Sequence, residues 1–576
     1  MNKPIIKAML MGQVLLLAML TGWGWAAALP PAATPGAVEK SLQTQPLPQP
    51  ARLPEIKIEG KDEAEMVGGA ISTQLKSVVF EGNAVYSSDQ LQRVIAGFIG
   101  QTMEVSKLAN VADAVTAYYK RGDFFLTAAY IPPQTIKDGR LLIKIREARL
   151  GEIIVQGNKR YSQELINNTL QVVRKAGAIR LADVERALLL LMDKPGLSVQ
   201  ATFKPGRLPA TSDIVLDVTE SRFYDFSIDY NNFGSRFISQ NRYGATLNLN
   251  NLSGRGDALN MHQATGDGGL DKLTYSRMEY VLPLGYNGTK MGINYNYMKY
   301  KLGKELEPLD AGGEVNGGSF WASHPLVRSR NFNWYLQGGF NLSDVSQKVA
   351  GTEVGKDKIR YANLGTTVQW FDSFDGNNTV SFRVNRGFEN ILGGTEKNSP
   401  DTIRTSTDIA YTKLEMDLIR FQRLPAGFSL LLNGTGQWSS DRLPSSEQFH
   451  LGGAGTVRGY AQAEHSGDTG FAATAELRIP FFGLQNQRWY GRPVGEMLQL
   501  AAFYDYGKVW IANAAQYGEQ ALDGLEMQGA GAGIRCTFSP YVRFKVDWAQ
   551  SVGGINPLRD SDKNSGIWLA QLVLTF

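Results

Sequence analysis

Apolar and polar side chains alternate along YGATLNLNNL, Tyr243 to Leu252. In an extended strand, successive side chains point to opposite faces, so the two kinds separate. The apolar face carries Tyr243, Ala245, Leu247 and Leu249, and the polar face carries Gly244, Thr246, Asn248 and Asn250. One face suits lipid and the other suits a wet lumen, which is the pattern of a strand in a membrane β-barrel.

The same alternation recurs throughout the C-terminal part of the chain, residues 221–576. It is clear in GINYNYMKY (Gly292–Tyr300), FNWYLQGGFNL (Phe332–Leu342) and YVRFKVDWA (Tyr541–Ala549). At about ten residues a strand plus turns and loops, the region suits an even number of strands near ~16. The sequence therefore predicts a transmembrane antiparallel β-barrel of about 16 strands over 221–576.

A soluble β-sandwich or β-helix is the alternative reading of this alternation. The abundance of tyrosine and tryptophan, 23 and 10 residues, favours the barrel, because these side chains form girdles at the membrane interfaces. The chain also ends in the strand pattern IWLAQLVLTF, with Phe576 as its last residue. A C-terminal aromatic residue on an alternating strand resembles the insertion signal of bacterial outer-membrane barrels.

Bulk composition limits the other classes of function. The 576 residues carry a net charge of only +4 without a conspicuous basic run, which argues against a nucleic-acid partner. The mean hydropathy of −0.22 argues against a bundle of membrane helices. The single cysteine, Cys536, excludes an internal disulfide and any cysteine-rich metal site.

The first 28 residues predict a secretory signal peptide. Lys3 and Lys7 form its charged end, Ala8–Leu20 its short apolar core, and Ala26-Ala27-Ala28 a small-residue cleavage site. The following segment, 29–74, is rich in Pro, Ala and Gln and reads as flexible or polyproline-like. Its one helical candidate, Ala37–Thr44, is barely two turns long.

A repeat spaced by 75 residues precedes the barrel, since VVFEGNAVYS (Val78–Ser87) matches IIVQGNKRYS (Ile153–Ser162). Each copy starts as a strand that stops at a Gly-Asn turn signal. Two helical patterns follow in each copy: Asp89–Ile99 and Lys107–Lys120, then Gln163–Val173 and Leu181–Met192. Two strands close each copy, the last being Gly139–Glu147 and Ser212–Glu220. The order predicts two small α+β modules, each with an exposed sheet edge.

This paired pattern resembles POTRA domains, the periplasmic modules of outer-membrane protein transporters. The resemblance covers 75–147 as a first module and 148–220 as a second. A location in the Gram-negative outer membrane, with the modules in the periplasm, is what it implies.

A glycine-rich loop, LGGAGTVRGY (Leu451–Tyr460), lies inside the barrel region and carries one arginine. An arginine in so sparse a loop needs a carboxylate, a phosphate or water. Alone, the stretch would read as a surface hairpin with a solvated arginine. Within a barrel, Val457, Arg458, Gly459 and Tyr460 resemble the tip motif of the sixth extracellular loop in two-partner secretion transporters (TpsB; ShlB/FhaC/HecB type) and their BamA-like relatives.

The family resemblance implies that this loop folds into the lumen and that Arg458 pairs with the aspartate of a Phe-x-Asp motif. Here AAFYDYG supplies Phe503 and Asp505, on the strand face opposite Tyr504. We therefore predict an Arg458–Asp505 latch in the lumen. Further lumen charges are Glu476, Arg478 and Asp547; Glu476 and Asp547 are rival partners for Arg458, and charges screened by water are the alternative to any pairing.

Catalytic signals are weak, so the sequence predicts neither an enzyme nor a metal or cofactor site. The four histidines show no metal-ligand spacing, and GxSxG is missing. GTEVGKD (Gly351–Asp357) is too short for a phosphate loop, and GAGAG (Gly529–Gly533) lies among strands, where close packing is its expected role. A dispersed Ser/His or Asp/His site, as in some outer-membrane hydrolases, stays an alternative.

The predicted function is an outer-membrane pore that recognises a partner exoprotein through its N-terminal secretion domain and exports it. By resemblance, the cargo is a large adhesin, haemolysin or toxin. Other expected partners are outer-membrane lipid and the barrel assembly machinery that inserts the protein. The alternative is a barrel insertase of the BamA kind; a passive porin would not explain the repeated modules. Many family members carry a longer charged N-terminal helix that plugs the pore, and the short Ala37–Thr44 segment gives little support for a plug here.

Overall fold

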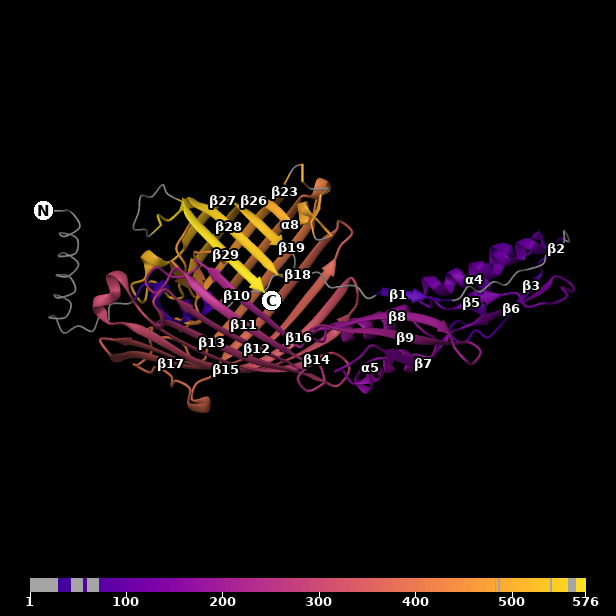
Figure 1. Ribbon diagram of the computed structural model, residues 1–576, viewed down its shortest axis with the longest axis horizontal. Helices are drawn as coiled ribbons and strands as arrows, with labels where there is room; N and C mark the ends of the chain where they lie inside the picture. Colours follow the sequence, from indigo (N-terminus) through magenta and orange to yellow (C-terminus); the bar gives the residue numbers. More distant parts are fainter. Residues whose placement is uncertain are drawn as a thin grey trace.

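The computed structural model describes residues 29–42, 55–59, 72–481, 483–484, 487–489, 491–538, 541–557 and 566–576. Two small modules of sheet and helix extend from one mouth of a wide barrel (Figure 1). This arrangement confirms the predicted fold class. The predicted signal peptide, 1–28, and parts of 29–74 lie outside the described residues.

The first module places two helices on a three-stranded sheet of order β3-β6-β5. β3 pairs with β6 in parallel, and β5 pairs with β6 antiparallel. Its elements are β2 (Ser72–Gln74), β3 (Ser77–Glu81), α3 (Ser88–Ile95), β4 (Thr102–Glu104), α4 (Ala109–Arg121), β5 (Ala128–Tyr130) and β6 (Arg140–Arg146). The first predicted helix ends earlier than expected, at Ile95, and a 3-10 turn that contains Gly97 follows it.

The second module repeats this plan, with a sheet of order β1-β8-β9-β7. Its elements are β7 (Arg149–Gln156), α5 (Gln163–Thr169), α6 (Gln171–Lys175), α7 (Leu181–Met192), β8 (Leu197–Pro205) and β9 (Thr211–Glu220). The helix predicted over Gln163–Val173 is divided at Leu170. The Thr169 hydroxyl donates to the Leu165 carbonyl at 2.8 Å, and such a bond competes with the helical ladder.

Strand β1 (Glu55–Ile58), which the sequence did not predict, extends the second sheet. It pairs in parallel with the outer edge of β8, from Glu55 opposite Gln200 to Ile58 opposite Phe203. The Glu59 backbone N–H also donates to the Phe203 carbonyl at 2.9 Å. The segment before the first module therefore covers part of an edge that belongs to the second.

The repeated Gly-Asn motif makes the same turn in both modules. Gly82 and Gly157 have φ of +91° and +85°, a region that favours glycine. The side-chain amide of the next asparagine donates to the backbone carbonyl three residues on, at 2.9 Å in both copies. The serine that follows caps the first helix in each copy. A repeat read from the sequence is thus a repeated hydrogen-bonded corner.

A carboxylate at the end of the last strand of each module completes that corner; in the first module, Glu147 accepts the Val85 backbone N–H at 2.8 Å. In the second module, Glu220 accepts the backbone N–H groups of Lys159, Arg160 and Tyr161 at 2.7–3.1 Å. Burial alone would raise the pKa of Glu220, but these N–H groups and the Arg160 guanidinium outweigh it and hold the pKa below its usual range. The ionised carboxylate therefore stabilises the folded module.

Sixteen strands close the barrel in chain order, and the last one, β29, pairs antiparallel with the first, β10. They are β10 (Tyr224–Asn231), β11 (Arg242–Asn250), β12 (Ala258–Gly266), β13 (Gly269–Leu284), β14 (Thr289–Lys301), β15 (Gly312–Arg328), β16 (Phe332–Val349), β17 (Thr352–Phe371), β18 (Gly376–Gly387), β19 (Thr412–Arg423), β20 (Ser429–Trp438), β23 (Thr469–Pro480), β26 (Leu498–Trp510), β27 (Leu525–Phe538), β28 (Val542–Gly554) and β29 (Ile567–Thr575). The Phe576 N–H donates to the Phe226 carbonyl at 2.8 Å and the two rings stack, so the C-terminal residue lies at the closing seam.

The predicted alternation matches the wall of the barrel. Tyr243 and Trp548 are exposed on the outside, whereas Thr246 and Asp547 point inward, where Thr246 bonds His262 and Asp547 is fully buried. Among the helices in the described part of the chain, none combines the length and apolar character that a membrane-spanning helix needs.

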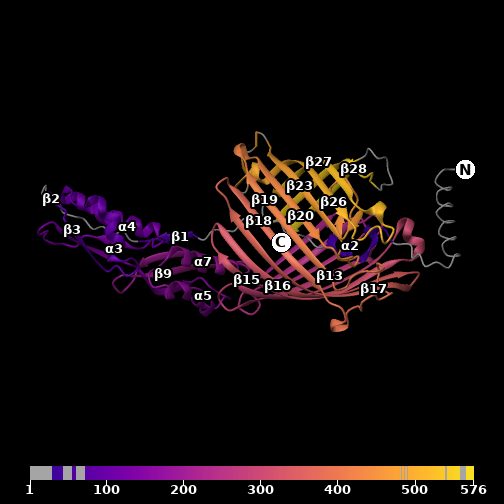
Figure 2. The same ribbon diagram turned by 180° about the vertical axis from the view of Figure 1, so that it is seen from behind.

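A short helix near the N-terminus lies inside the barrel (Figure 2). Helix α2 (Pro35–Leu42) begins two residues before the expected Ala37, while residues 43 and 44 are outside the described ranges. Val38 and Leu42 are buried against lumen-facing side chains such as Tyr275 and Met298. The expectation that a plug has little support is therefore wrong for this structure.

Hydrogen bonds to the wall fix α2 in place. Arg242 donates to the Ser41 carbonyl and hydroxyl at 2.7 Å each, and Tyr300 donates to the Ala33 carbonyl at 2.6 Å. The partners lie 201 and 267 residues away in sequence, so no local pattern could predict them. Length alone was a poor guide, because two turns suffice when the surrounding wall supplies the contacts.

The second module is attached to the barrel mouth by charged contacts. Arg328, at the end of β15, makes a two-pronged bond to the Asp193 carboxylate at 2.7 and 2.8 Å. Arg330 pairs with Glu185 of α7 at 2.8 Å. The modules extend away from this mouth of the barrel (Figure 1).

Replacing Glu220 by alanine should destabilise the turn at 159–161 by about 1–3 kcal/mol, since three N–H groups lose their acceptor. Hydrogen–deuterium exchange of the full-length protein should show lower protection factors there. A carboxylate with a lowered pKa stabilises the fold above its unfolded value of about 4 and loses that contribution as pH falls further. Protection should thus decline in acid in the native protein and not in the variant. Glu164→Ala, on the exposed first turn of α5, is the control; equal protection and equal acid sensitivity in all three would contradict this role.

Candidate functional site

The connection between β20 and β23, residues 439–468, enters the barrel. Counted from β10, it is the sixth connection at the mouth opposite the modules. A short hairpin, β21 (Phe449–Leu451) with β22 (His465–Gly467), forms its base. At its tip, Val457, Arg458 and Tyr460 are buried. The VRGY motif is therefore part of the interior of the barrel.

Glycine lets the tip lie flat against the wall. Gly459 has φ of +100°, and a Cβ there would lie 2.7 Å from the carbonyl carbon of Gln550 on β28. Any larger residue would push the tip off the strand. The Tyr460 hydroxyl donates to the backbone carbonyl of Gly553 at 2.5 Å and lies 3.1 Å from that of Ile555, which ties the same tip to the end of β28.

The Arg458 guanidinium makes its main contact with Asp505. Nε donates to Oδ2 at 2.8 Å and Nη2 donates to Oδ1 at 3.0 Å, a forked geometry, while the Arg458 backbone N–H donates to Oδ2 at 3.0 Å. Both side chains are buried. Forked, charge-assisted bonds of this kind are among the strongest that side chains form. The structure thus brings together the two residues that the sequence predicted as a pair.

The two rival partners also contact Arg458. Nη1 donates to Glu476 Oε2 at 3.0 Å and to Asp547 Oδ2 at 3.3 Å. The guanidinium also lies over an aromatic ring, since Arg458 Cζ is 3.3 Å from the centroid of the Phe503 ring. The three carboxylates are therefore not alternatives: one cation fills a cradle made by β23, β26 and β28.

Two more cations belong to this cradle, and the sequence analysis missed both. Arg535 of β27 donates from Nε and Nη2 to Glu476 at 3.1 and 2.6 Å and from Nη1 to Asp547. Lys545 of β28 lies 3.2 Å from Asp547. Arg478, a predicted lumen charge, donates to Glu476 at 2.9 Å. The signal that could have found Arg535 is its register, since it shares the inward face of β27 with Gly529.

A row of glycines on β27 makes room for the arginine loop, the connection 439–468 that carries Arg458. Gly529, Gly531 and Gly533 alternate along the inward face of the strand. A Cβ at Gly529 would lie 1.9 Å from the Arg458 carbonyl oxygen, and one at Gly533 would lie 2.1 Å from Asp547 Oδ1. The GAGAG stretch is thus the surface on which the tip rests, a close-packed strand as the sequence suggested.

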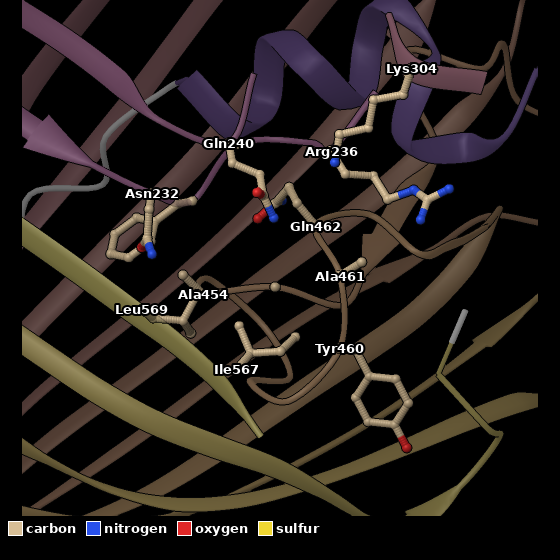
Figure 3. Close-up of a pocket in the computed structure, with 13 residues that line it drawn as sticks. Asn232, Arg236, Gln240, Lys304, Ala454, Tyr460, Ala461, Gln462, Ile567 and Leu569 are labelled. Carbon is tan, nitrogen blue, oxygen red and sulfur yellow. The ribbon is translucent and has the colours of Figure 1, made fainter. Parts of the chain in front are cut away.

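The opposite flank of the loop faces a hollow of about 210 Å³ that is open to solvent. Figure 3 shows Ala454, Tyr460, Ala461 and Gln462 on its loop side, and Arg236 and Ile567 across from them. The tip of the loop is packed on the wall on one side and borders this hollow on the other. The loop therefore has space to move away from the cradle without disturbing the barrel.

Charged side chains tie three connections together at the far mouth. Arg404 donates to Asp468 at 2.6 and 3.1 Å, and Arg442 donates to both oxygens of Glu519 at 2.7 and 2.9 Å. These residues come from 388–411, 439–468 and 511–524, so the network links the connection that carries Arg458 to two neighbouring ones. No sequence motif marks it.

The plug helix and the arginine loop touch each other. The Lys40 ammonium donates to the Gln448 carbonyl at 2.8 Å, and a Cβ at Gly36 would lie 2.1 Å from the Cα of Ser446. The two obstructions in the lumen therefore share an interface. No group of three or more histidine, cysteine or acidic side chains in the described ranges is placed to hold a metal ion.

Comparison with family models and known proteins shows which proteins this chain is similar to. The model of the haemolysin secretion/activation protein family ShlB/FhaC/HecB matches residues 210–536, and that of the ShlB-type POTRA domain matches 73–148. The heme/hemopexin transporter protein HuxB of Haemophilus influenzae is 23% identical over 501 residues, 86% of each chain. The outer membrane transporter CdiB of Escherichia coli O6:K15:H31 is 25% identical over 434 residues, 71% of this chain and 69% of its own.

Solved structures agree on the fold. CdiB from Escherichia coli superimposes with a TM-score of 0.69 at 19% identity, covering 100% of this chain and 99% of that one. BamA from Haemophilus ducreyi lacking POTRA domains 1–3 gives 0.53 at 13% identity, covering 88% and 99%. The shared architecture is that of small α/β modules followed by a barrel.

A side chain at Gly529 should displace the arginine loop. Gly529→Ala forces the Arg458 carbonyl away from β27, with a penalty of about 1–3 kcal/mol for overpacking. Limited proteolysis should then cut 439–464 faster than in the native protein. Gly434→Ala on β20, where the nearest atom lies 3.7 Å from a Cβ, is the matched control. Equal cleavage of the loop in both variants would show that the row of glycines does not position it.

Proposed function

Because this chain belongs to the haemolysin secretion/activation protein family ShlB/FhaC/HecB, we propose that its arginine loop is the gate on the path of an exported protein. Family membership makes the chain a two-partner secretion transporter of the outer membrane, which exports a partner exoprotein and is not an enzyme. This confirms the predicted family, function and location. It also decides against the BamA-like insertase, whose likeness to this chain is one of fold.

The gate is proposed because two elements obstruct the lumen. Helix α2 and the arginine loop both occupy the interior, so an exoprotein passes only after they move. Breaking a buried ion pair typically costs about 3–5 kcal/mol, enough to keep a pore closed at rest yet within reach of a binding event. The gate is the Arg458 contact with Asp505, supported by Phe503, Glu476 and Asp547.

Capture of the exoprotein falls to the two POTRA modules. An extended segment of the cargo's N-terminal secretion domain adds to an exposed strand edge, where backbone bonds give affinity without a fixed sequence. The β8 edge is one such place, and β1 already pairs with part of it. The same N-terminal segment covers this edge and plugs the lumen through α2, so cargo binding at β8 favours withdrawal of the plug.

The class of cargo is a large secreted adhesin, haemolysin or toxin. The relatives add transport of heme or hemopexin as a second class, through the name of HuxB. Outer-membrane lipid contacts the apolar outer face of the barrel, and the barrel assembly machinery recognises the C-terminal strand with Phe576, whose side chain is exposed.

Removing the arginine should disable secretion. We expect Arg458→Ala and Asp505→Ala each to reduce export of a reporter carrying the exoprotein's N-terminal secretion domain by about tenfold or more, with the barrel still folded in the membrane, because a loop that has lost its docked position stays loose in the lumen and obstructs the cargo. A swap of the two charges should not restore export, because Glu476 and Asp547 would then face an aspartate. Arg420→Gln, on β19 near the mouth beside the modules, is the control. Normal export by Asp505→Ala with unchanged cleavage of the loop would refute the gate.

Loosening the plug should open an ion path. Val38→Asp places a charge among the apolar side chains that hold α2, at several kcal/mol if the helix stays. Channel conductance in planar bilayers should rise relative to the native protein and to Val38→Ile, which keeps the site apolar. If all three conduct alike, α2 does not block the lumen.

A further inference from the structure

We infer that Arg535 takes the place of Arg458 as the partner of the Glu476 and Asp547 carboxylates when the loop leaves. This stand-in role makes the Arg458 gate reversible. The inference rests on the proposed gate and goes beyond it, because Arg535 belongs to the barrel wall on β27 and not to the loop that carries Arg458. Its partners are the Glu476 and Asp547 carboxylates, the same two that receive Nη1 of Arg458. Two arginines from different elements thus share two carboxylates.

The three carboxylates of the cradle differ in the number of cations that contact each of them. Glu476 has Arg535 and Arg478 besides Arg458, and Asp547 has Arg535 and Lys545. Within the described part of the chain, Asp505 is bonded by Arg458 alone. When the loop leaves, two carboxylates keep partners that belong to the barrel wall, and only Asp505 loses all of its own.

Formal charges show the consequence. With the loop docked, four cations face three carboxylates, so the cluster carries one excess positive charge. With Arg458 withdrawn, three cations face three carboxylates and the wall is neutral. A buried charge without a partner is strongly unfavourable, so a neutral wall keeps the released state accessible. Among the wall residues in the described ranges, Arg535 alone contacts both of the shared carboxylates.

Without Arg535 the balance reverses. The docked cluster becomes neutral, and the released wall is left with one excess carboxylate in a confined space. Glu476 and Asp547 then depend more on Arg458, and the loop should be held more tightly. This tightening of the loop is opposite to the usual effect of such a substitution, since loss of a buried ion-pair partner usually loosens the structure around it.

Room for the released state exists beside the loop. The hollow in Figure 3 borders Tyr460, Ala461 and Gln462, the residues that follow the arginine motif. Withdrawal into this space moves Arg458 off the wall while Arg535 stays on β27. The cradle can therefore empty and refill without a change in the barrel strands.

The test compares Arg535→Gln with Arg535→Lys and the control Arg420→Gln in the full-length protein. We expect Arg535→Gln to slow proteolysis of 439–464 and to lower export of the N-terminal-domain reporter, each by about tenfold, the factor for a difference near 1.4 kcal/mol. Arg535→Lys, which keeps the charge, should lie near the native protein, and so should the control. Faster cleavage of the loop in Arg535→Gln would overturn the inference and show that Arg535 only holds the cradle together.

A second variant separates this inference from the gate itself. Arg458→Ala should make the loop more sensitive to protease whether or not Arg535 is present, because the docked cation is gone. If Arg458→Ala leaves the loop unchanged, the gate is refuted. If Arg458→Ala loosens the loop and Arg535→Gln loosens it too, the gate stands and the stand-in role fails. Adding Arg535→Gln to Asp505→Asn should restore part of the loop protection that Asp505→Asn alone removes; no recovery would also count against it.

Discussion

One buried guanidinium organises the interior of this transporter. Arg458 meets carboxylates from three strands and one aromatic face, so its position fixes the loop that carries it. Charges in a confined, partly dry lumen attract each other far more strongly than at a surface, and an unpartnered one is strongly destabilising. The glycines of β27, the flat tip at Gly459 and the inward face of β26 all serve this contact. The glycines supply space around Arg458, and the inward face of β26 supplies the charge that it contacts.

A closed barrel in a membrane has little freedom to open by itself, because every strand edge is paired. Movement is left to elements inside it. Both such elements here, α2 and the arginine loop, are held by polar contacts together with small apolar clusters, and they touch each other at Gln448 and Ser446. Polar contacts that water can replace suit a seal that must be broken and remade. The strand β1 extends this linkage to the second POTRA module, so one N-terminal segment spans the lumen and a docking edge.

Sequence patterns predicted the parts of the fold that depend on local periodicity. Alternation located the barrel, and the repeated Gly-Asn corner located both modules, because each reflects backbone geometry within a few residues. Resemblance supplied Asp505, which strand register then placed on the inward face. Sequence failed where partners are distant: the plug depends on Arg242 and Tyr300, and β1 depends on β8. Arg535 was missed for a different reason, since a single arginine in register has no motif until its neighbours are known.

The most direct measurement uses a reversible bond between the loop tip and the wall. A Cβ at Gly507 would lie 3.1 Å from a side-chain carbon of Val457, so cysteines at these two positions, in a Cys536→Ser background, are within disulfide reach once the end of the Leu451 side chain, 2.4 Å from that Cβ, moves aside. The account predicts that oxidation locks the tip in the cradle and stops export of the exoprotein, and that reduction restores it in the same cells. Export at the native rate with the bond formed would mean that the cargo passes while Arg458 is docked, and the gate described here would not exist.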